Sequence, residues 1–204
     1  SNSCRMMHKM AFITRLLIKF SLLAVCLSWA CATQAESMRA TRAEAVVGSQ
    51  GQLNVSSRFN TTLPSALQDA LKQGVTLNFE LNYQLVAPKL LAYNMRFNPL
   101  VDTVKPVIYK LSYHPLTDKY RVTVGTFSTE YSQLDTALRA VGSIANWQVH
   151  PKSTFGRNDA GQIQANVRLN LSSNQLPKPF QVNTLTSKNW NLDSGWVRLR
   201  ARAG

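Results

Sequence analysis

The chain is poor in the side chains on which most enzymes and metal sites depend. Its three cysteines, Cys4, Cys26 and Cys31, all precede residue 35, so the rest of the chain can form neither a disulfide scaffold nor a thiolate metal site. Two histidines follow, His114 and His150, and neither has carboxylates at metal-ligand spacing around it. We therefore expect no bound metal and no cofactor.

Sequence signatures of catalysis are missing as well. The chain has no Gly-x-Ser-x-Gly nucleophile elbow and no glycine-rich phosphate loop. Its ten acidic residues are mostly isolated, and Asp69, Asp118 and Asp135 fit a helix surface, a turn and a helix start. A triad built around one of the two histidines is the enzymatic alternative. We expect a protein that is not an enzyme.

The first 35 residues have the order of features found in export signals. Basic residues from Lys9 to Lys19 form a positive end, residues 20–32 are an apolar run, and residues 33–35 (Thr-Gln-Ala) are a small-x-small cleavage site. A permanent membrane span needs about 20 apolar residues, more than this run supplies. We expect residues 1–35 to be a cleaved signal peptide and the protein to be periplasmic. An uncleaved inner-membrane anchor and a lipoprotein at Cys26 are the alternatives.

Basic residues outnumber acidic ones along the chain. The leader holds four of the 23 basic residues and none of the acidic ones, so 19 basic and ten acidic residues follow it, a net charge of +9. Export argues against nucleic acid as the partner, which leaves anionic lipid or an acidic protein surface. Arg198, Arg200 and Arg202 alternate, and on a strand they share one face. This face is either simply solvated or a contact for such a partner.

The spacing of apolar residues predicts a mainly β protein. Residues 76–86 alternate strictly between apolar and polar side chains, which indicates a strand with one buried and one wet face. Similar alternation predicts further strands, namely residues 53–59, 90–97, a hairpin over 107–124, 165–171 and 196–202.

Two short helices interrupt these strands. Pro64 in a first turn and a stop at Gly74 indicate the first helix. The second is expected to start with Ser132 as its cap and to bury a stripe that ends at Ile144. We predict an antiparallel two-sheet β-sandwich of the immunoglobulin-like type as a single domain over residues 51–204, preceded by a flexible tether at residues 36–50.

Prolines and large aromatic residues are concentrated between residues 175 and 196, and the composition of the chain does not explain why they lie together. The prolines hold the backbone extended, and the aromatic rings are large for a loop. The segment either covers one end of the sandwich or forms an exposed surface for a protein partner. With the neighbouring basic residues, the candidate interaction surface is Pro177, Lys178, Pro179, Phe180, Trp190, Trp196, Arg198 and Arg200.

The same segment carries a family resemblance. Leu176-Pro-Lys-Pro-Phe-Gln-Val-Asn183, followed by Asn189-Trp-Asn-Leu-Asp-Ser-Gly-Trp196, resembles the C-terminal signature of the exported bacterial proteins grouped as domain of unknown function 4390. Residues 111–122 and 134–141 support the resemblance, which covers about residues 50–200. It implies an exported protein without an assigned activity and brings no catalytic residues. It also implies a sensor kinase as one candidate partner.

These observations predict the kind of function but not a reaction. We expect an exported periplasmic protein that serves as a non-catalytic protein-interaction module in sensing or maintenance of the Gram-negative envelope. Its partner would be an unknown envelope protein, such as a sensor kinase, with anionic lipid as a further contact. A β-sandwich that binds a lipid or a small apolar ligand, and a membrane-tethered accessory subunit, are the two alternatives.

Overall fold

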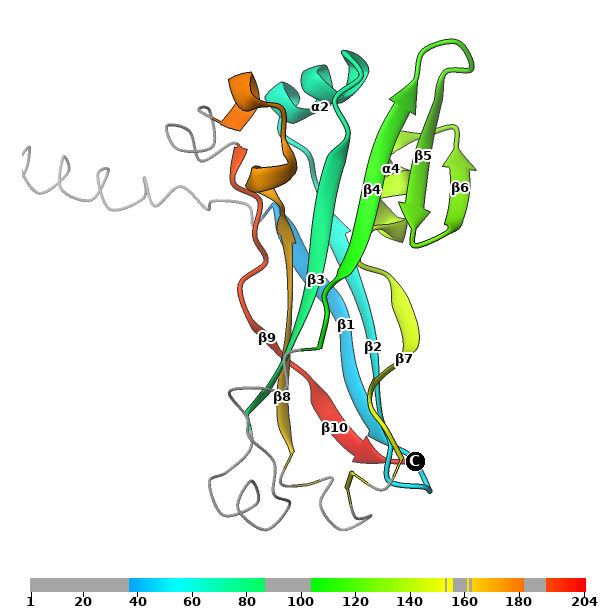
Figure 1. The fold of residues 1–204 in the computed structure, drawn as a ribbon, viewed down its shortest axis with the longest axis vertical. Coiled ribbons are helices and arrows are strands. Elements are labelled where there is room, and N and C mark those ends of the chain that lie inside the picture. Colours follow the sequence, from blue (N-terminus) through cyan, green and yellow to red (C-terminus); the bar gives the residue numbers. More distant parts are fainter. Residues whose placement is uncertain (1–36, 87–103, 153, 156–160, 162, 182–189) are drawn as a thin grey trace, which may run out of the picture. The chain divides into compact units, whose positions relative to one another are not determined.

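The computed structural model describes residues 37–86, 104–152, 154–155, 161, 163–181 and 190–204 (Figure 1). These residues form a mainly β structure with two sheets. Sheet A has four strands in the order β10-β1-β2-β7, and sheet B has six in the order β6-β5-β4-β3-β8-β9. The strands are β1 (Met38–Val47), β2 (Leu53–Thr61), β3 (Leu77–Val86), β4 (Val107–His114), β5 (Lys119–Val124), β6 (Phe127–Tyr131), β7 (Ile144–His150), β8 (Gln164–Leu171), β9 (Val197–Arg198) and β10 (Arg200–Ala203). The predicted strand at residues 90–97 lies outside the described residues.

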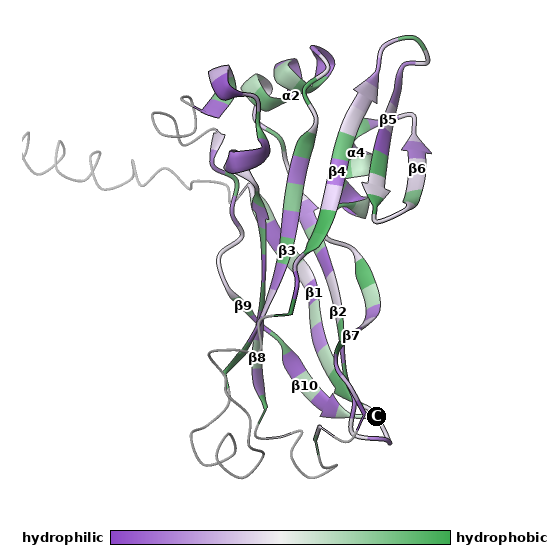
Figure 2. Ribbon diagram, in the orientation of Figure 1, coloured by the Kyte–Doolittle hydropathy of each residue, from purple (hydrophilic) through white to green (hydrophobic). Residues whose placement is uncertain are grey.

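Strand β3 is the inner strand on which sheet B is organised. It pairs antiparallel with β4 on one side and with β8 on the other. Leu77, Phe79 and Leu81 are fully buried, whereas the polar residues between them lie on the opposite face, so the strict alternation predicted for this segment is confirmed. Figure 2 shows the same alternation of apolar and polar residues along β3.

Residues 36–50 were expected to be a flexible tether, and the structure corrects this. Met38–Val47 form β1, which pairs antiparallel with β2 and parallel with β10. The inward positions are taken by small residues such as Ala45, and a register shift between Ala40 and Arg42 interrupts the alternation. Small inward residues and a bulge together hide this strand from a search for apolar periodicity.

The helices are short and lie between the strands in the chain. Helix α2 (Ser65–Lys72) follows Pro64 as predicted and buries Leu67 and Leu71. Helix α4 (Leu134–Ala140) is shorter than predicted. Its N-cap is Gln133, which makes no side-chain cap hydrogen bond, so the expected Ser132 cap is wrong. Ile144, expected in the buried stripe of this helix, instead begins β7. A third helix, the 3-10 turn η2 (Ser173–Gln175), follows β8.

The end of the chain passes from one sheet to the other. Residues 196–202 were expected to form one strand, but they form two, β9 in sheet B and β10 in sheet A. The turning point is Leu199, whose side chain is buried and whose N–H donates a hydrogen bond to the carbonyl oxygen of Ala165 at 2.8 Å. The C-terminal segment therefore links the two sheets.

Buried residues of both sheets belong to one hydrophobic core. At Gly142, which has φ +73°, a Cβ atom would come within 2.7 Å of Leu169 Cδ2 in β8 and 2.9 Å of Phe59 Cδ2 in β2. A residue of sheet A and a residue of sheet B thus meet over this glycine. The close approach requires a residue without a side chain, and the positive φ favours glycine as well.

Candidate functional site

The first part of the predicted interaction surface is divided between core and solvent. Trp190 is 8% exposed and its ring lies against that of Phe180, with the centroids 5.4 Å apart. Phe180 is half-buried, and residues 178–181 form a helical turn. Pro177, Lys178 and Pro179 are exposed. The structure therefore places the aromatic rings of this region over the core and its prolines in the solvent.

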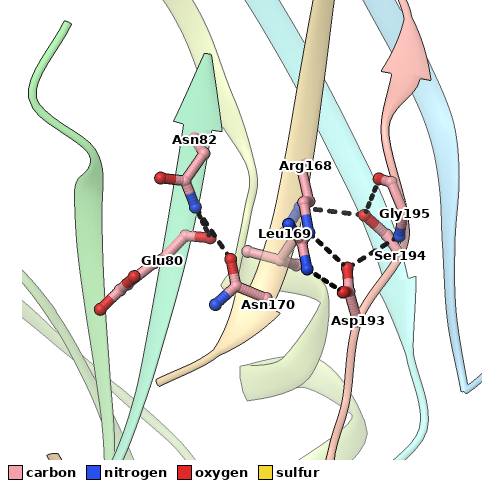
Figure 3. Close-up of polar contacts among 8 residues, drawn as sticks. All are labelled: Glu80, Asn82, Arg168, Leu169, Asn170, Asp193, Ser194 and Gly195. Carbon is pink, nitrogen blue, oxygen red and sulfur yellow. Dashed lines mark hydrogen bonds and ion pairs between the residues drawn. The ribbon is translucent and has the colours of Figure 1, made fainter. Parts of the chain in front are cut away.

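An ion pair fixes the following segment to β8 (Figure 3). Arg168 of β8 reaches both carboxylate oxygens of Asp193, with Nε donating to Oδ1 at 2.8 Å and Nη2 contacting Oδ2. The backbone N–H of Gly195 donates to the same Oδ1 at 2.8 Å. The hydrogen bond from Arg168 is the main reason why the pKa of Asp193 lies below its usual range, and the same bond raises the pKa of Arg168.

Backbone hydrogen bonds continue this attachment. The N–H of Leu169 donates to Ser194 Oγ, and the N–H of Ser194 donates to the carbonyl oxygen of Leu169, both at 2.9 Å. The N–H of Leu171 donates to the carbonyl oxygen of Leu192 at 2.8 Å. Residues 192–195 therefore lie along β8 as an added edge, and their conformation is set by paired polar groups on both sides.

Trp196 follows this edge and is exposed. Its side chain is 46% exposed, and the guanidinium carbon of Arg168 lies 5.9 Å from the centroid of its ring. An arginine stacked at this distance stabilises the ring position by a cation–π interaction. Because Asp193 also binds Arg168, the exposed indole rests on an arginine that is itself held by an ion pair within the chain.

The outward face of sheet B around this point is polar and its charges are mostly paired. Asn82 Nδ2 of β3 donates to Asn170 Oδ1 of β8 at 2.8 Å (Figure 3). Farther along the sheet, Glu130 accepts a 2.6 Å hydrogen bond from Arg121 and lies 3.8 Å from Lys119 Nζ. The hydrogen bond from Arg121 lowers the pKa of Glu130.

Sheet A has an outward face of a different kind, which we call the arginine face. Its strands alternate between buried apolar residues and outward polar ones, and the pairing places Arg42 opposite Arg58, Glu44 opposite Arg200, and Val46 opposite Arg202. The arginine face consists of five exposed side chains on three adjacent strands, Arg39, Arg42, Arg58, Arg200 and Arg202.

One carboxylate stands among these arginines. Glu44 Oε2 lies 2.9 Å from Arg42 Nη2 and 3.4 Å from Arg202 Nη2, and the hydrogen bond from Arg42 is the main cause that lowers its pKa. Strands β1, β2 and β10 contain no other acidic residue. Five guanidinium groups share one carboxylate, which leaves the face strongly positive.

A groove of about 240 Å³ lies where the arginine face meets the edge of sheet B. Three arginines from three different strands line it, Arg42 of β1, Arg198 of β9 and Arg200 of β10. The sequence singled out Arg198 and Arg200, and the structure brings both to this groove although they belong to different sheets. It missed Arg39, Arg42 and Arg58, because residues 36–50 were interpreted as a tether and Arg58 was one polar residue in an alternating strand.

The described residues offer no cluster suited to a metal ion. Within the ranges that the structure covers, no three His, Cys, Asp or Glu side chains come together as a metal site would require. His114 ends β4 and His150 ends β7. None of the described helices has the length and apolar character needed to cross a bilayer.

Comparison with known proteins gives one finding. A family model described as "Domain of unknown function (DUF4390)" matches residues 35–200, which is most of the chain. No curated protein and no solved structure matches the chain.

Proposed function

The chain belongs to the DUF4390 family, and from that premise we propose that it is an exported, non-catalytic envelope protein that works by binding another protein. The leader of residues 1–35 supports export to the periplasm, because it has the charge, apolar run and small residues of a signal peptide. The partner in this proposal is an envelope protein, for which the periplasmic part of a sensor kinase is the first candidate.

The observation that carries the proposal is the fixed, exposed indole of Trp196. Tryptophan and arginine are the residues most enriched among those that dominate binding energy at protein interfaces. Here they lie together, with Arg168 under the ring and Asp193 holding Arg168. A side chain that is already held in place loses little conformational entropy when a partner covers it. The exposed prolines at residues 177 and 179 belong to the same C-terminal segment.

The decisive experiment is photo-crosslinking in cells, with the protein expressed at its native level. A photoreactive residue replaces Lys178 in one strain and Asn191 in another, both of which are exposed. We expect both positions to capture the same envelope protein, and Trp196→Ala to reduce that capture at least tenfold, as expected for loss of a binding hot spot of about 2 kcal/mol.

Phe127→Ala is the matched control. Phe127 is also a large exposed aromatic residue, 82% exposed, but it lies on β6 at the far edge of sheet B. Its removal should leave capture unchanged. Absence of a reproducible partner, or equal capture with Trp196→Ala, would contradict the proposal. The N-terminal residue of the protein recovered from the periplasm, read by intact mass, tests the cleavage after residue 35.

We propose in addition that the two sheets are the layers of an immunoglobulin-like β-sandwich. The proposal is supported by the single core that their buried residues share and by the approach of Phe59 and Leu169 over Gly142. A crystal structure tests it directly. Sheets that do not face each other across this core would contradict it.

A further inference from the structure

We propose that the arginine face docks on an anionic phospholipid surface, and that the groove between β1 and β9 takes the phosphate of one headgroup. The groove includes Val197 and Arg198, which follow Trp196 in the chain, but the arginine face itself lies on sheet A. The inference therefore goes beyond the proposed protein contact and does not depend on it. Three features of the face lead to it: its charge, the type of its side chains, and what it lacks.

Most of the positive charge on the arginine face is not neutralised by ion pairs within the protein. Glu44 is the one carboxylate on β1, β2 and β10, and it contacts Arg42 and Arg202. Among the described residues, no ion pair is found for Arg39, Arg58 or Arg200. Like charges on one sheet face repel each other and destabilise the sheet slightly, so a cluster of this kind favours a bound anion.

The side chains are all arginine rather than lysine. The planar guanidinium presents parallel N–H donors that match two oxygens of a phosphate, whereas the ammonium of lysine acts as a point charge. On β1 and β2, successive outward residues are about 7 Å apart along each strand, and the strands are about 5 Å apart. Such a face offers a set of separate phosphate contacts in one layer, which suits a surface that carries many phosphates.

The face also lacks what a stable protein interface requires. The outward residues of β1, β2 and β10 include no aromatic side chain; those between the arginines are Thr41, Glu44, Val46, Asn54, Ser56 and Asn60. The centres of protein interfaces are enriched in aromatic residues and depleted of charge. A polar and cationic face without an aromatic anchor therefore favours the headgroup layer of a membrane over an acidic protein.

The groove adds a specific position to this general attraction. Arg42, Arg198 and Arg200 reach it from three strands, and Glu44 also lines it. Because β10 pairs with β1 only over Glu44–Val47, the preceding part of β1 borders the groove instead of a strand. The crossing of the chain at Leu199 is what places Arg198 and Arg200 on its two sides.

The test is binding to vesicles of phosphatidylcholine with and without phosphatidylglycerol, measured by co-sedimentation of the protein as recovered from the cell envelope. We expect binding only to the anionic vesicles, weakening as salt is raised. A basic residue near such a surface contributes on the order of fivefold to binding, so the double variant Arg58→Gln, Arg200→Gln should bind about 30-fold more weakly.

The control removes the same charge from the other sheet. Lys110→Gln combined with Arg121→Gln lowers the net charge by the same amount on the outward face of sheet B, and it should bind nearly as well as the wild type. Thermal unfolding of each variant checks that it is folded. If the first pair does not fold, Arg39→Gln with Arg202→Gln replaces it, since both residues are exposed and lie on the same face.

Photo-crosslinking to lipid is a second measurement. It locates the contact on the folded domain, whether or not the N-terminal residues also bind lipid. A photoreactive residue at Asn60, on the arginine face, should capture phospholipid in the anionic vesicles, and one at Gln84, on the outward face of sheet B, should not. The proposal would be overturned if the protein bound both kinds of vesicle equally and Gln84 captured lipid as strongly as Asn60. It would also be overturned if the two double variants lost the same amount of vesicle binding. Binding to polyglutamate without binding to anionic vesicles would overturn it in favour of an acidic protein.

Discussion

The outward faces of sheet A and sheet B carry similar side chains but arrange their charges differently. On sheet B, Glu130 of β6 and Asp193, which lies beside β8, each form an ion pair with an arginine. Most carboxylates on this face are therefore paired within the molecule. On sheet A, Glu44 is the only carboxylate among five arginines. Charges that are paired hold segments in place, whereas charges in excess are available to a partner. In the two proposals above, sheet B supports Trp196 and sheet A binds a partner of its own.

The largest effect is expected where the interiors of the two sheets meet. Gly142→Ala forces a side chain at φ +73° and against Leu169 and Phe59, so we expect a loss of about 3 kcal/mol in the free energy of unfolding. Urea denaturation measures it. Gly125→Ala is the control, because Gly125 also has positive φ but has no atom within 4 Å of the added Cβ, and it should cost about 1 kcal/mol. Equal losses would mean that the sheets are not closely packed at this point.

A smaller loss of stability is expected when the Arg168–Asp193 ion pair on sheet B is removed. Asp193→Asn removes the charge that holds Arg168 and weakens the acceptor of the Gly195 N–H, so stability should fall by about 1 kcal/mol, since both partners keep some exposure to solvent. Glu44→Gln on sheet A is the matched change and should cost less in the same urea titration, because Arg42 and Arg202 are more exposed than Arg168. If the two variants lose equal stability, the Arg168–Asp193 pair has no special supporting role.

Acid should affect the wild type more than the Asp193→Asn variant. The pKa of Asp193 is lowered in the folded protein, mainly by Arg168, so its contribution to stability is fully present above the unfolded pKa of about 4. It is lost as the pH falls below that value toward the lowered folded pKa. Melting temperatures at neutral pH and in this acid range should therefore converge for the two proteins as the pH falls. A constant gap would show that the carboxylate acts without its charge.

The smallest expected effect has the opposite sign to the others, because it is a gain. Glu44→Gln removes the one negative charge of the arginine face, so binding to phosphatidylglycerol vesicles should rise by about threefold. Glu130→Gln removes another arginine-paired carboxylate, from sheet B, and vesicle binding should not change. A gain in both variants would indicate that net charge alone, rather than the arginine face, controls binding in the co-sedimentation assay.

The parts of the fold that could be predicted from the sequence are those whose apolar residues are large and regular. Strand β3 and helix α2 lie where the pattern placed them. Strand β1 could not be found in this way, because alanine fills inward positions and a bulge shifts the period. Strand β7 is not predicted from the sequence, and its first residue, Ile144, is expected in the buried stripe of the second helix because it stands at helical spacing from α4. Only the tertiary structure separates the two elements.

The candidate sites were predictable to different degrees. Trp196 was identified as a large aromatic residue in an expected loop, and Arg198 and Arg200 by their alternation beside it; the exposure of Trp196 agrees with a surface role. The arginine face as a whole was not predictable, because Arg39 and Arg42 lie on a strand that apolar periodicity does not reveal. Arg200 and Arg202, at the other end of the chain, join them only through the pairing of β10 with β1. The support of Trp196 by Arg168 depends on a similar long-range contact.

The parallel pairing of β10 with β1 also has a kinetic consequence. The first described strand needs the last one to complete its sheet, so sheet A cannot close before nearly the whole chain is available. Contacts between residues so far apart in sequence form slowly, because a long loop must be ordered before they can form. Because β1 can pair with β10 only after β10 has been synthesised, the chain remains unfolded longer. Such a delay would suit a chain that is exported before it folds, as proposed above.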